Sequence, residues 1–132
     1  MSWSGLLKSA PSGLQIAGVL GASGILLGAF GSHALPKILA KREDLVGGTP
    51  QEFIEIWKTA VLYQLLHAVA LASSPNWPVQ SRAIGIGLMS VGVALFSGSC
   101  YAVALAGDRA VGKLAPYGGY CMIFGWLALL WP

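Results

Sequence analysis

Charged side chains are so sparse in this 132-residue chain that they divide it into four long uncharged runs. The runs cover residues 9–36, 59–81, 83–107 and 114–132. A helix needs about 20 mainly apolar residues to cross about 30 Å of hydrocarbon, because each residue advances 1.5 Å. Backbone polar groups in lipid must be satisfied within the segment itself, so each run is predicted to form a spanning helix.

We therefore predict an all-α fold, an integral membrane four-helix bundle in which the whole chain is a single domain. The spans are expected at about 13–34, 50–73, 82–106 and 114–131. Charged residues make up 10% of the chain, against about 25% in soluble domains. The runs also lack the polar face of 3.6-residue period that a soluble bundle needs. This composition disfavours a soluble catalytic domain, a disordered tail, a disulfide scaffold and a nucleic-acid binder.

The second span has the clearest start signal. Thr49-Pro50-Gln51-Glu52 matches a capping box with proline at the first helical position. Residues 36–48 are predicted to be a polar loop, and 73–78 and 107–109 to be short turns. The apolar run of the first span is too long for a secretory signal peptide, so this span is expected to remain as an uncleaved helix.

The distribution of cations predicts the orientation, because lysine and arginine gather on the inner side of membrane proteins. The first and third loops are expected inside and both termini outside, since the loop cations are Lys37, Lys41, Arg42, Arg109 and Lys113. The opposite side has only Lys8 and Arg82. Aromatic belts agree, with His33 and Trp57 placed at the inner interface and an outer belt of Trp3, Trp77 and Trp131.

Small residues recur at the spacings that allow close helix contact in lipid, where the hydrophobic effect does not drive association. The third span offers a row that should form a groove for a neighbouring helix: Ser90, Ala94, Gly98, Ala102 and Ala106. The other small positions are Ala17, Gly21, Gly24, Gly28 and Ser32 in the first span and Gly118, Gly119 and Gly125 in the last. This surface exceeds what four helices need, which predicts a partner helix, either from a second copy of the chain or from another membrane subunit.

Polar side chains inside a membrane are costly and are therefore candidate functional residues. Seven of them are expected to form a polar layer in the inner half of the bilayer, with Tyr63, Gln64, His67 and Tyr101 as the candidate network and Ser97, Ser99 and Tyr120 beside them. One interpretation is an interhelical hydrogen-bond network that stabilises the bundle. The other is a small polar pocket or half-channel that opens inward.

The sequence offers little for catalysis, cofactors or metals. His33 lies at the boundary while His67 lies about 13 Å deeper, so the pair is too staggered to hold a haem. Cys100 and Cys121 share a depth but lack the further ligands of a zinc site. Glu52 and Glu55 lie in the first two turns of the second span, which should project from the bilayer, so no carboxylate is expected within the membrane. We therefore expect no catalytic residue, no cofactor and no metal site.

Four blocks of the sequence resemble the transmembrane protein 256 family, whose bacterial relatives are known as domain of unknown function 423. The blocks are 28–35 (GAFGSHAL), 57–68 (WKTAVLYQLLHA), 96–101 (FSGSCY), and 116–119 (PYGG) with Gly125 and Trp126. The resemblance covers about residues 13–131. It implies a small multi-pass membrane protein without an established activity, and its eukaryotic members are associated with mitochondria.

The function expected from these features is that of a non-catalytic accessory subunit in a larger membrane complex, such as a respiratory-chain complex of the mitochondrial inner membrane. The inside would then be the matrix and the termini would face the intermembrane space. Expected partners are other membrane subunits and membrane lipids, with lipid head groups at Lys37, Lys41 and Arg42. The alternative is a small transporter or channel-like protein that uses the polar layer around His67.

Overall fold

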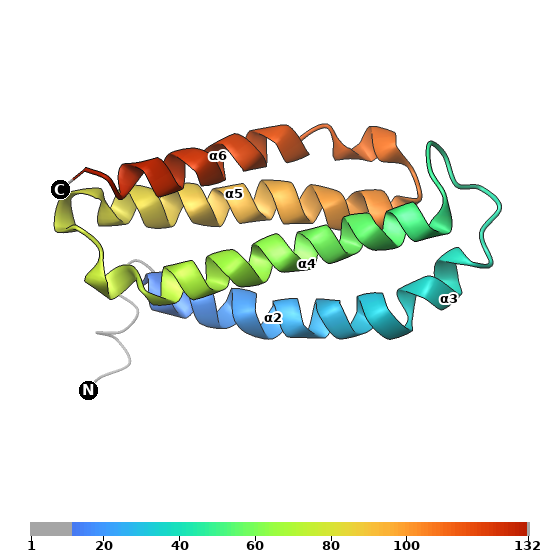
Figure 1. Cartoon of the computed structure of the whole chain (residues 1–132), viewed down its shortest axis with the longest axis horizontal. Coiled ribbons are helices and arrows are strands. Elements are labelled where there is room, and N and C mark those ends of the chain that lie inside the picture. The colour runs from blue at the N-terminus through green and yellow to red at the C-terminus, as the bar shows by residue number, and fades with distance from the viewer. Residues whose placement is uncertain (1–11, 132) are drawn as a thin grey trace, which may run out of the picture.

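The computed structural model describes residues 12–131, and within them every regular element is a helix. Four long helices form an antiparallel bundle (Figure 1): α2 (Gly13–His33), α4 (Pro50–Ala72), α5 (Val79–Ala106) and α6 (Ala115–Ala128). Three short ones connect them: α3 (Leu35–Leu39), η1 (Ser74–Asn76) and η2 (Arg109–Gly112). The all-α prediction and the four predicted helices are confirmed. Lys8 and Trp3, used above for the orientation, lie outside the described residues.

The ends of the helices follow local chemistry. Thr49 and Glu52 form the predicted capping box: the Thr49 hydroxyl accepts from the Glu52 backbone N–H, and the Glu52 carboxylate accepts from the Thr49 backbone N–H. Ser12 and Gln15 cap α2 in the same way. At its C-terminus α5 ends on Gly107, whose φ of 67° is a left-handed conformation that suits glycine.

Three boundaries differ from the prediction, and one of them is the start of α5, at Val79 rather than near Arg82. Residues 35–39, expected to begin a polar loop, form α3, because Leu35 and Leu39 are one turn apart and are both fully buried. The last helix ends at Ala128 rather than near Trp131. Beyond Ala128 the backbone continues in a tighter turn, with hydrogen bonds between residues three apart up to Trp131.

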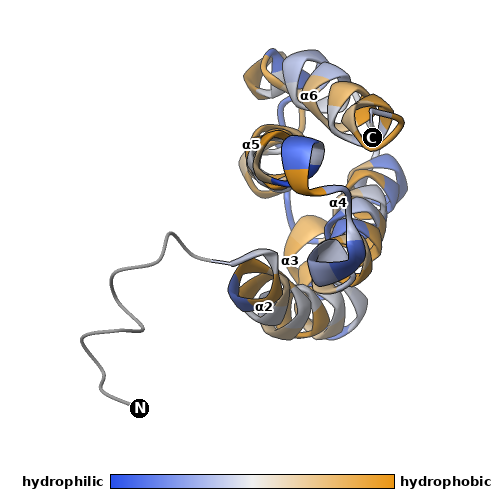
Figure 2. Ribbon diagram, turned by 90° about the vertical axis from the view of Figure 1, so that its left-hand side faces the viewer, coloured by the Kyte–Doolittle hydropathy of each residue, from blue (hydrophilic) through white to orange (hydrophobic). Residues whose placement is uncertain are grey.

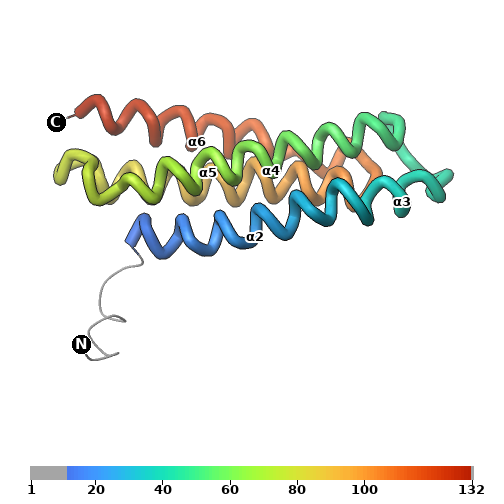
Figure 3. Tube along the Cα trace, turned by 60° about the horizontal axis from the view of Figure 1, so that its bottom comes forward, coloured from blue at the N-terminus to red at the C-terminus, as the bar shows by residue number. Residues whose placement is uncertain are grey.

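Each long helix packs mainly against the next one in the chain: α2 contacts α4, α4 contacts α5, and α5 contacts α6. Viewed end-on, α2 and α6 lie at opposite sides with α4 and α5 between them (Figure 2). The start of α2 and the end of α6 lie at the same end of the bundle (Figure 3). We call the other end, made of α3 and residues 40–58 and 107–114, the charged end, because it carries all five acidic residues.

Length and apolar composition allow two of the described helices, α2 and α5, to cross a membrane. The other two long helices, α4 and α6, are not among these, and each has a local reason. The first turns of α4 contain Glu52, Glu55 and Lys58, and α6 has only 14 residues before its tighter last turn.

The interior consists of two apolar clusters. One lies at the charged end and includes Leu35, Phe53 and Trp57. The other lies toward the opposite end and includes Leu71 and Met89. The buried polar side chains of Gln64, His67 and Ser97 lie between these clusters, so these polar groups fill a middle layer rather than an exposed face.

Glycines of α5 and α6 face large side chains of the opposite helix. A Cβ on Gly125 would lie 2.7 Å from Met89 Cγ, and a Cβ on Gly92 would lie 2.5 Å from Met122 Cγ. At Gly118 the neighbour is the backbone itself, since a Cβ there would lie 2.7 Å from the Gly92 carbonyl oxygen. The two helices therefore meet at a distance that only glycine permits.

The predicted row from Ser90 to Ala106 does not form a groove for another helix of the described chain. Steps of four residues advance about 400° around a helix, and five such positions therefore spread over about 160°. Ala94 and Gly98 are exposed, and nothing lies within 4 Å of a Cβ placed on Gly98. Two of the small residues predicted in the first span do lie at a helix contact, because Ala17 and Gly24 are buried against α4.

Candidate functional site

Polar side chains of the bundle interior form three separate hydrogen-bonded sets, centred on Gln64, His67 and Ser97. We call their members together the polar layer: Ser23, Gln64, His67, Ser97, Tyr101 and Trp126. Gln64 is the centre of the largest set. The Gln64 amide nitrogen donates to Leu20 O at 2.9 Å and to Ser23 Oγ at 2.8 Å, both on α2. The Gln64 amide oxygen accepts from the Tyr101 hydroxyl of α5 at 2.7 Å. One side chain of α4 thus connects three helices.

His67, one turn further along α4, connects to α6. Its Nε2 lies 3.1 Å from Trp126 Nε1, and its Nδ1 lies 2.7 Å from the Tyr63 carbonyl oxygen. An indole N–H can only donate, so Nε2 must accept and Nδ1 must carry the proton. The imidazole is therefore a neutral ring with both nitrogens engaged. It is 2% exposed.

The remaining bonds of the interior also join helices. Ser97 of α5 donates to Ala60 O of α4 at 2.7 Å, and both residues are buried. Trp57 of α4 donates from its indole to Leu27 O of α2 at 2.8 Å. Each acceptor is a backbone carbonyl, so these contacts pin one helix to the main chain of the next.

The polar layer lies nearer the middle of the bundle than the inner half where it was expected. Ser97 and Ala60 share a level because they are hydrogen-bonded. An equal step along antiparallel helices places His67 level with about Ser90, which is close to the middle of α5. The expectation counted depth from Lys58, but the bundle continues beyond that residue through the first turns of α4.

The structure places the predicted site residues Gln64, Tyr101, His67 and Tyr63 in different surroundings. Gln64 and Tyr101 are bonded to each other, and His67 bonds to Tyr63 only through the backbone of Tyr63. The Tyr63 ring is 37% exposed and packs on Phe96 with ring centres 4.7 Å apart.

Trp57 is not an interfacial anchor as expected. It is 2% exposed, and its ring packs between Phe30 and Tyr101. His33 is exposed on the last turn of α2, and its side chain has no hydrogen bond within residues 12–131. Of the outer tryptophans, Trp77 is also buried while Trp131 is exposed.

Two members of the polar layer, Ser23 and Trp126, were not singled out from the sequence as polar-layer residues. Serine in an apolar helix often bonds to its own backbone, and Ser23 indeed donates to Val19 O at 2.7 Å. Trp126 carries an indole N–H, a polar group that needs a partner inside lipid. That requirement is the signal that would have identified it.

At the charged end, the Arg42 side chain makes hydrogen bonds to groups of the same chain. Its guanidinium donates to both Asp44 carboxylate oxygens and to the carbonyls of Leu105 and Ala106, which have no helical partner at the end of α5. The hydrogen bond from Arg42 holds the pKa of the Asp44 carboxyl below its ordinary value. The expectation that Arg42 binds lipid head groups therefore does not fit, whereas Lys37 and Lys41 are exposed.

Cavities open along the helix grooves. One lies between α4 and α5 at the charged end and extends to Thr59 and Cys100. Another lies between α2 and α4 near Gly21 and Ala68. Neither is lined by Gln64 or His67. Within residues 12–131 no three His, Cys, Asp or Glu side chains gather as metal ligands, and both cysteines are free thiols.

A substitution tests whether His67 has a structural role. We expect His67→Leu to lower the free energy of unfolding by about 1 kcal/mol, because the Trp126 N–H loses its acceptor in an apolar surrounding. Unfolding in mixed micelles by increasing dodecyl sulfate would measure it, with Trp126→Phe as the matched loss of the donor. The double variant should then be hardly less stable than either single one. Unchanged stability in His67→Leu would contradict this role.

Comparison with known proteins gives consistent matches. A family model described as "Protein of unknown function (DUF423)" matches residues 27–119. The UPF0382 membrane protein YwdK of Bacillus subtilis is 31% identical over 123 residues, which cover 85% of this chain and 90% of the relative. A UPF0382 membrane protein of Schizosaccharomyces pombe is 31% identical over 122 residues, covering 88% and 96%. One of Staphylococcus saprophyticus is 32% identical over 107 residues, covering 78% and 80%. No solved structure matches.

Proposed function

This chain belongs to the DUF423 family of small integral membrane proteins, and from that premise we propose that it is a non-catalytic accessory subunit of a larger membrane complex. The observation that carries the proposal is a face of α5 that no part of the described chain covers. Small exposed residues follow one another along it at spacings of 4, 7 and 4, and these spacings keep them on one side of the helix: Ala83, Gly87, Ala94 and Gly98.

Small residues in a membrane helix allow another helix to approach closely. Gly92 and Gly118, which lie at a helix contact inside this bundle, have atoms of the opposite helix within 3 Å of an added Cβ. Gly87 and Gly98 have the same residue type but nothing within 4 Å of an added Cβ. A helix of another subunit would give them the kind of contact that Gly92 and Gly118 have inside the chain.

The chemistry of the interior also supports a packing role. All five acidic residues lie at the charged end, away from the polar layer. Gln64 and His67 are 4% and 2% exposed, and their side chains make hydrogen bonds to neighbouring helices. This sealed arrangement lends no support to a transporter or channel-like protein that works through His67, which would need the imidazole to meet water or substrate.

We further propose that the charged end faces the cytoplasm in bacteria or the matrix in mitochondria, because lysine and arginine favour the inner side. The specific complex that we propose is a respiratory-chain complex, in the mitochondrial inner membrane where the cell has mitochondria. Respiratory chains also operate in bacterial plasma membranes, which fits relatives from both bacteria and a fission yeast.

The proposal predicts that Gly98→Leu separates the protein from its complex without unfolding it. Leucine at this position enters open space within the chain but blocks the close approach of another helix. Blue-native electrophoresis in mild detergent should show the wild type in a large assembly and the variant as a small free species. The matched control is Val19→Leu on the exposed face of α2, which should co-migrate with the wild type. A wild type that migrates only as a small free species would refute the proposal.

A further inference from the structure

A groove between α2 and α4 at the charged end combines an apolar floor with a polar mouth. Two adjoining cavities of about 290 and 280 Å³ form it and share Gly31, Ser32 and Lys58 as lining residues. The first continues along Gly28 and Val61 toward the middle of the bundle. The second opens at Gln51. We call the two cavities together the α2–α4 groove.

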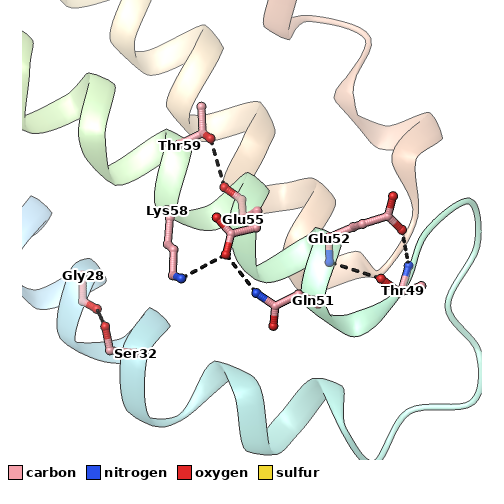
Figure 4. Close-up of polar contacts among 8 residues, drawn as sticks. All are labelled: Gly28, Ser32, Thr49, Gln51, Glu52, Glu55, Lys58 and Thr59. Carbon is pink, nitrogen blue, oxygen red and sulfur yellow. Dashed lines mark hydrogen bonds and ion pairs between the residues drawn. The ribbon is translucent and has the colours of Figure 1, made fainter.

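Glycine gives the groove its depth. A Cβ on Gly28 would meet only Val61 Cγ1, at 3.4 Å, so a larger side chain there would fill the space above the floor. The hydroxyl of Ser32, one turn further on, is hydrogen-bonded rather than free in the groove. It donates to the Gly28 carbonyl oxygen at 3.1 Å, as Figure 4 shows. The floor is therefore low and largely apolar for about one helical turn.

The mouth of the groove carries unused hydrogen-bond donors. Lys58 Nζ and Gln51 Nε2 both donate to the same Glu55 carboxylate oxygen, at 3.0 and 2.9 Å (Figure 4). An ammonium has three N–H groups and an amide has two, so three donors remain after these bonds. The Glu55–Lys58 pair is 56% exposed on both sides, and such pairs exchange partners at little cost.

The carboxylate lies beside the groove rather than in it. Glu55 lines the neighbouring cavity between α4 and α5 and is absent from the lining of the α2–α4 groove. The lining of the groove therefore supplies a cation and an amide, and the carboxylate nearest to both is their partner Glu55. An anion at the mouth would accept from the free N–H groups of Lys58 and Gln51 or replace Glu55 as their acceptor.

We propose that the α2–α4 groove binds an anionic phospholipid, with its phosphate at Lys58 and Gln51 and one acyl chain along Gly28 and Val61. Lys58 is the last charged residue of α4 before its uncharged stretch, which is the level where a phosphate group meets hydrocarbon. The direction of the groove, from polar mouth to apolar floor, matches that of a lipid molecule. A soluble phosphate would use the mouth but would gain nothing from the floor.

Native mass spectrometry of the delipidated full-length protein tests the proposal. The probes are phosphatidylglycerol and phosphatidylcholine of identical chains, added in equal amounts. We expect phosphatidylglycerol to bind more tightly, and Lys58→Gln to weaken that binding about five- to tenfold, as for the loss of one charge-assisted hydrogen bond. Lys113→Gln, the same change at an exposed lysine outside the groove, should have no such effect.

Gly28→Leu provides the second variant, because it fills the floor without touching the cation. It should weaken the binding of both lipids, whereas Gly98→Leu on the far face of α5 should not. Thermal unfolding in detergent checks that each variant folds. Equal binding of both lipids by the wild type, or an equal effect of Lys58→Gln and Lys113→Gln, would overturn the proposal. Displacement of phosphatidylglycerol by equimolar inorganic phosphate would assign the mouth to a soluble anion instead, and would overturn it as well.

Discussion

Gly118→Ala is expected to destabilise the bundle by about 2 to 3 kcal/mol. The methyl would lie 2.7 Å from the Gly92 carbonyl oxygen and 2.8 Å from Phe96 Cβ, and the Phe96 backbone nitrogen is nearer still. Backbone atoms of α5 cannot rotate away as a flexible side chain can. The variant can be accommodated only if α5 and α6 move apart, which weakens every contact between them.

The neighbouring residue supplies the control. A Cβ on Gly119 meets nothing within 4 Å, so Gly119→Ala adds the same methyl one position along the same helix without a clash. Its stability should stay within about 1 kcal/mol of the wild type, because alanine favours a helix more than glycine does. Unfolding in mixed micelles by dodecyl sulfate compares the two variants directly. Equal stability of both would show that the contact at Gly118 does not hold α5 and α6 together.

The close contact between α5 and α6 shows which parts of the fold could be predicted from the sequence and which could not. The four helices follow from the spacing of charged residues, which is a property of the chain alone. The pairing of glycines with large side chains is not, because Gly92 needs Met122 opposite it and Gly125 needs Met89. The predicted row through Ala94 and Gly98 satisfied the spacing but had no such partners within the chain.

The polar layer shows a similar division. Gln64, His67 and Tyr101 could be selected because a polar side chain deep in a membrane needs a reason to be there. Their partners could not be selected, since Trp126 reaches His67 only after α6 has packed on α5 in one rotation. Arg42 is a comparable case at the charged end: its bonds to the α5 carbonyls depend on the path of the loop between α3 and α4.

Gln64→Leu should lower the free energy of unfolding by about 2 kcal/mol. Three interhelical hydrogen bonds are lost, and bonds of this kind contribute about 0.6 kcal/mol each on average and at most about 1.7. Leucine is close to glutamine in volume, so the change removes polar contacts while it largely preserves packing. The Tyr101 hydroxyl and the Leu20 carbonyl would lose their contacts with Gln64. The same dodecyl sulfate titration measures the loss.

A double-mutant cycle with Tyr101→Phe isolates one of the three bonds. Because Tyr101 donates to Gln64, the second substitution should cost less in the Gln64→Leu background than in the wild type. Tyr63→Phe is the control, since the Tyr63 hydroxyl has no hydrogen bond within residues 12–131, and it should change stability by less than about 0.5 kcal/mol. If Gln64→Leu were as stable as Tyr63→Phe, the polar layer would not be what joins α2, α4 and α5. The burial of Gln64 would then have to serve a role other than packing.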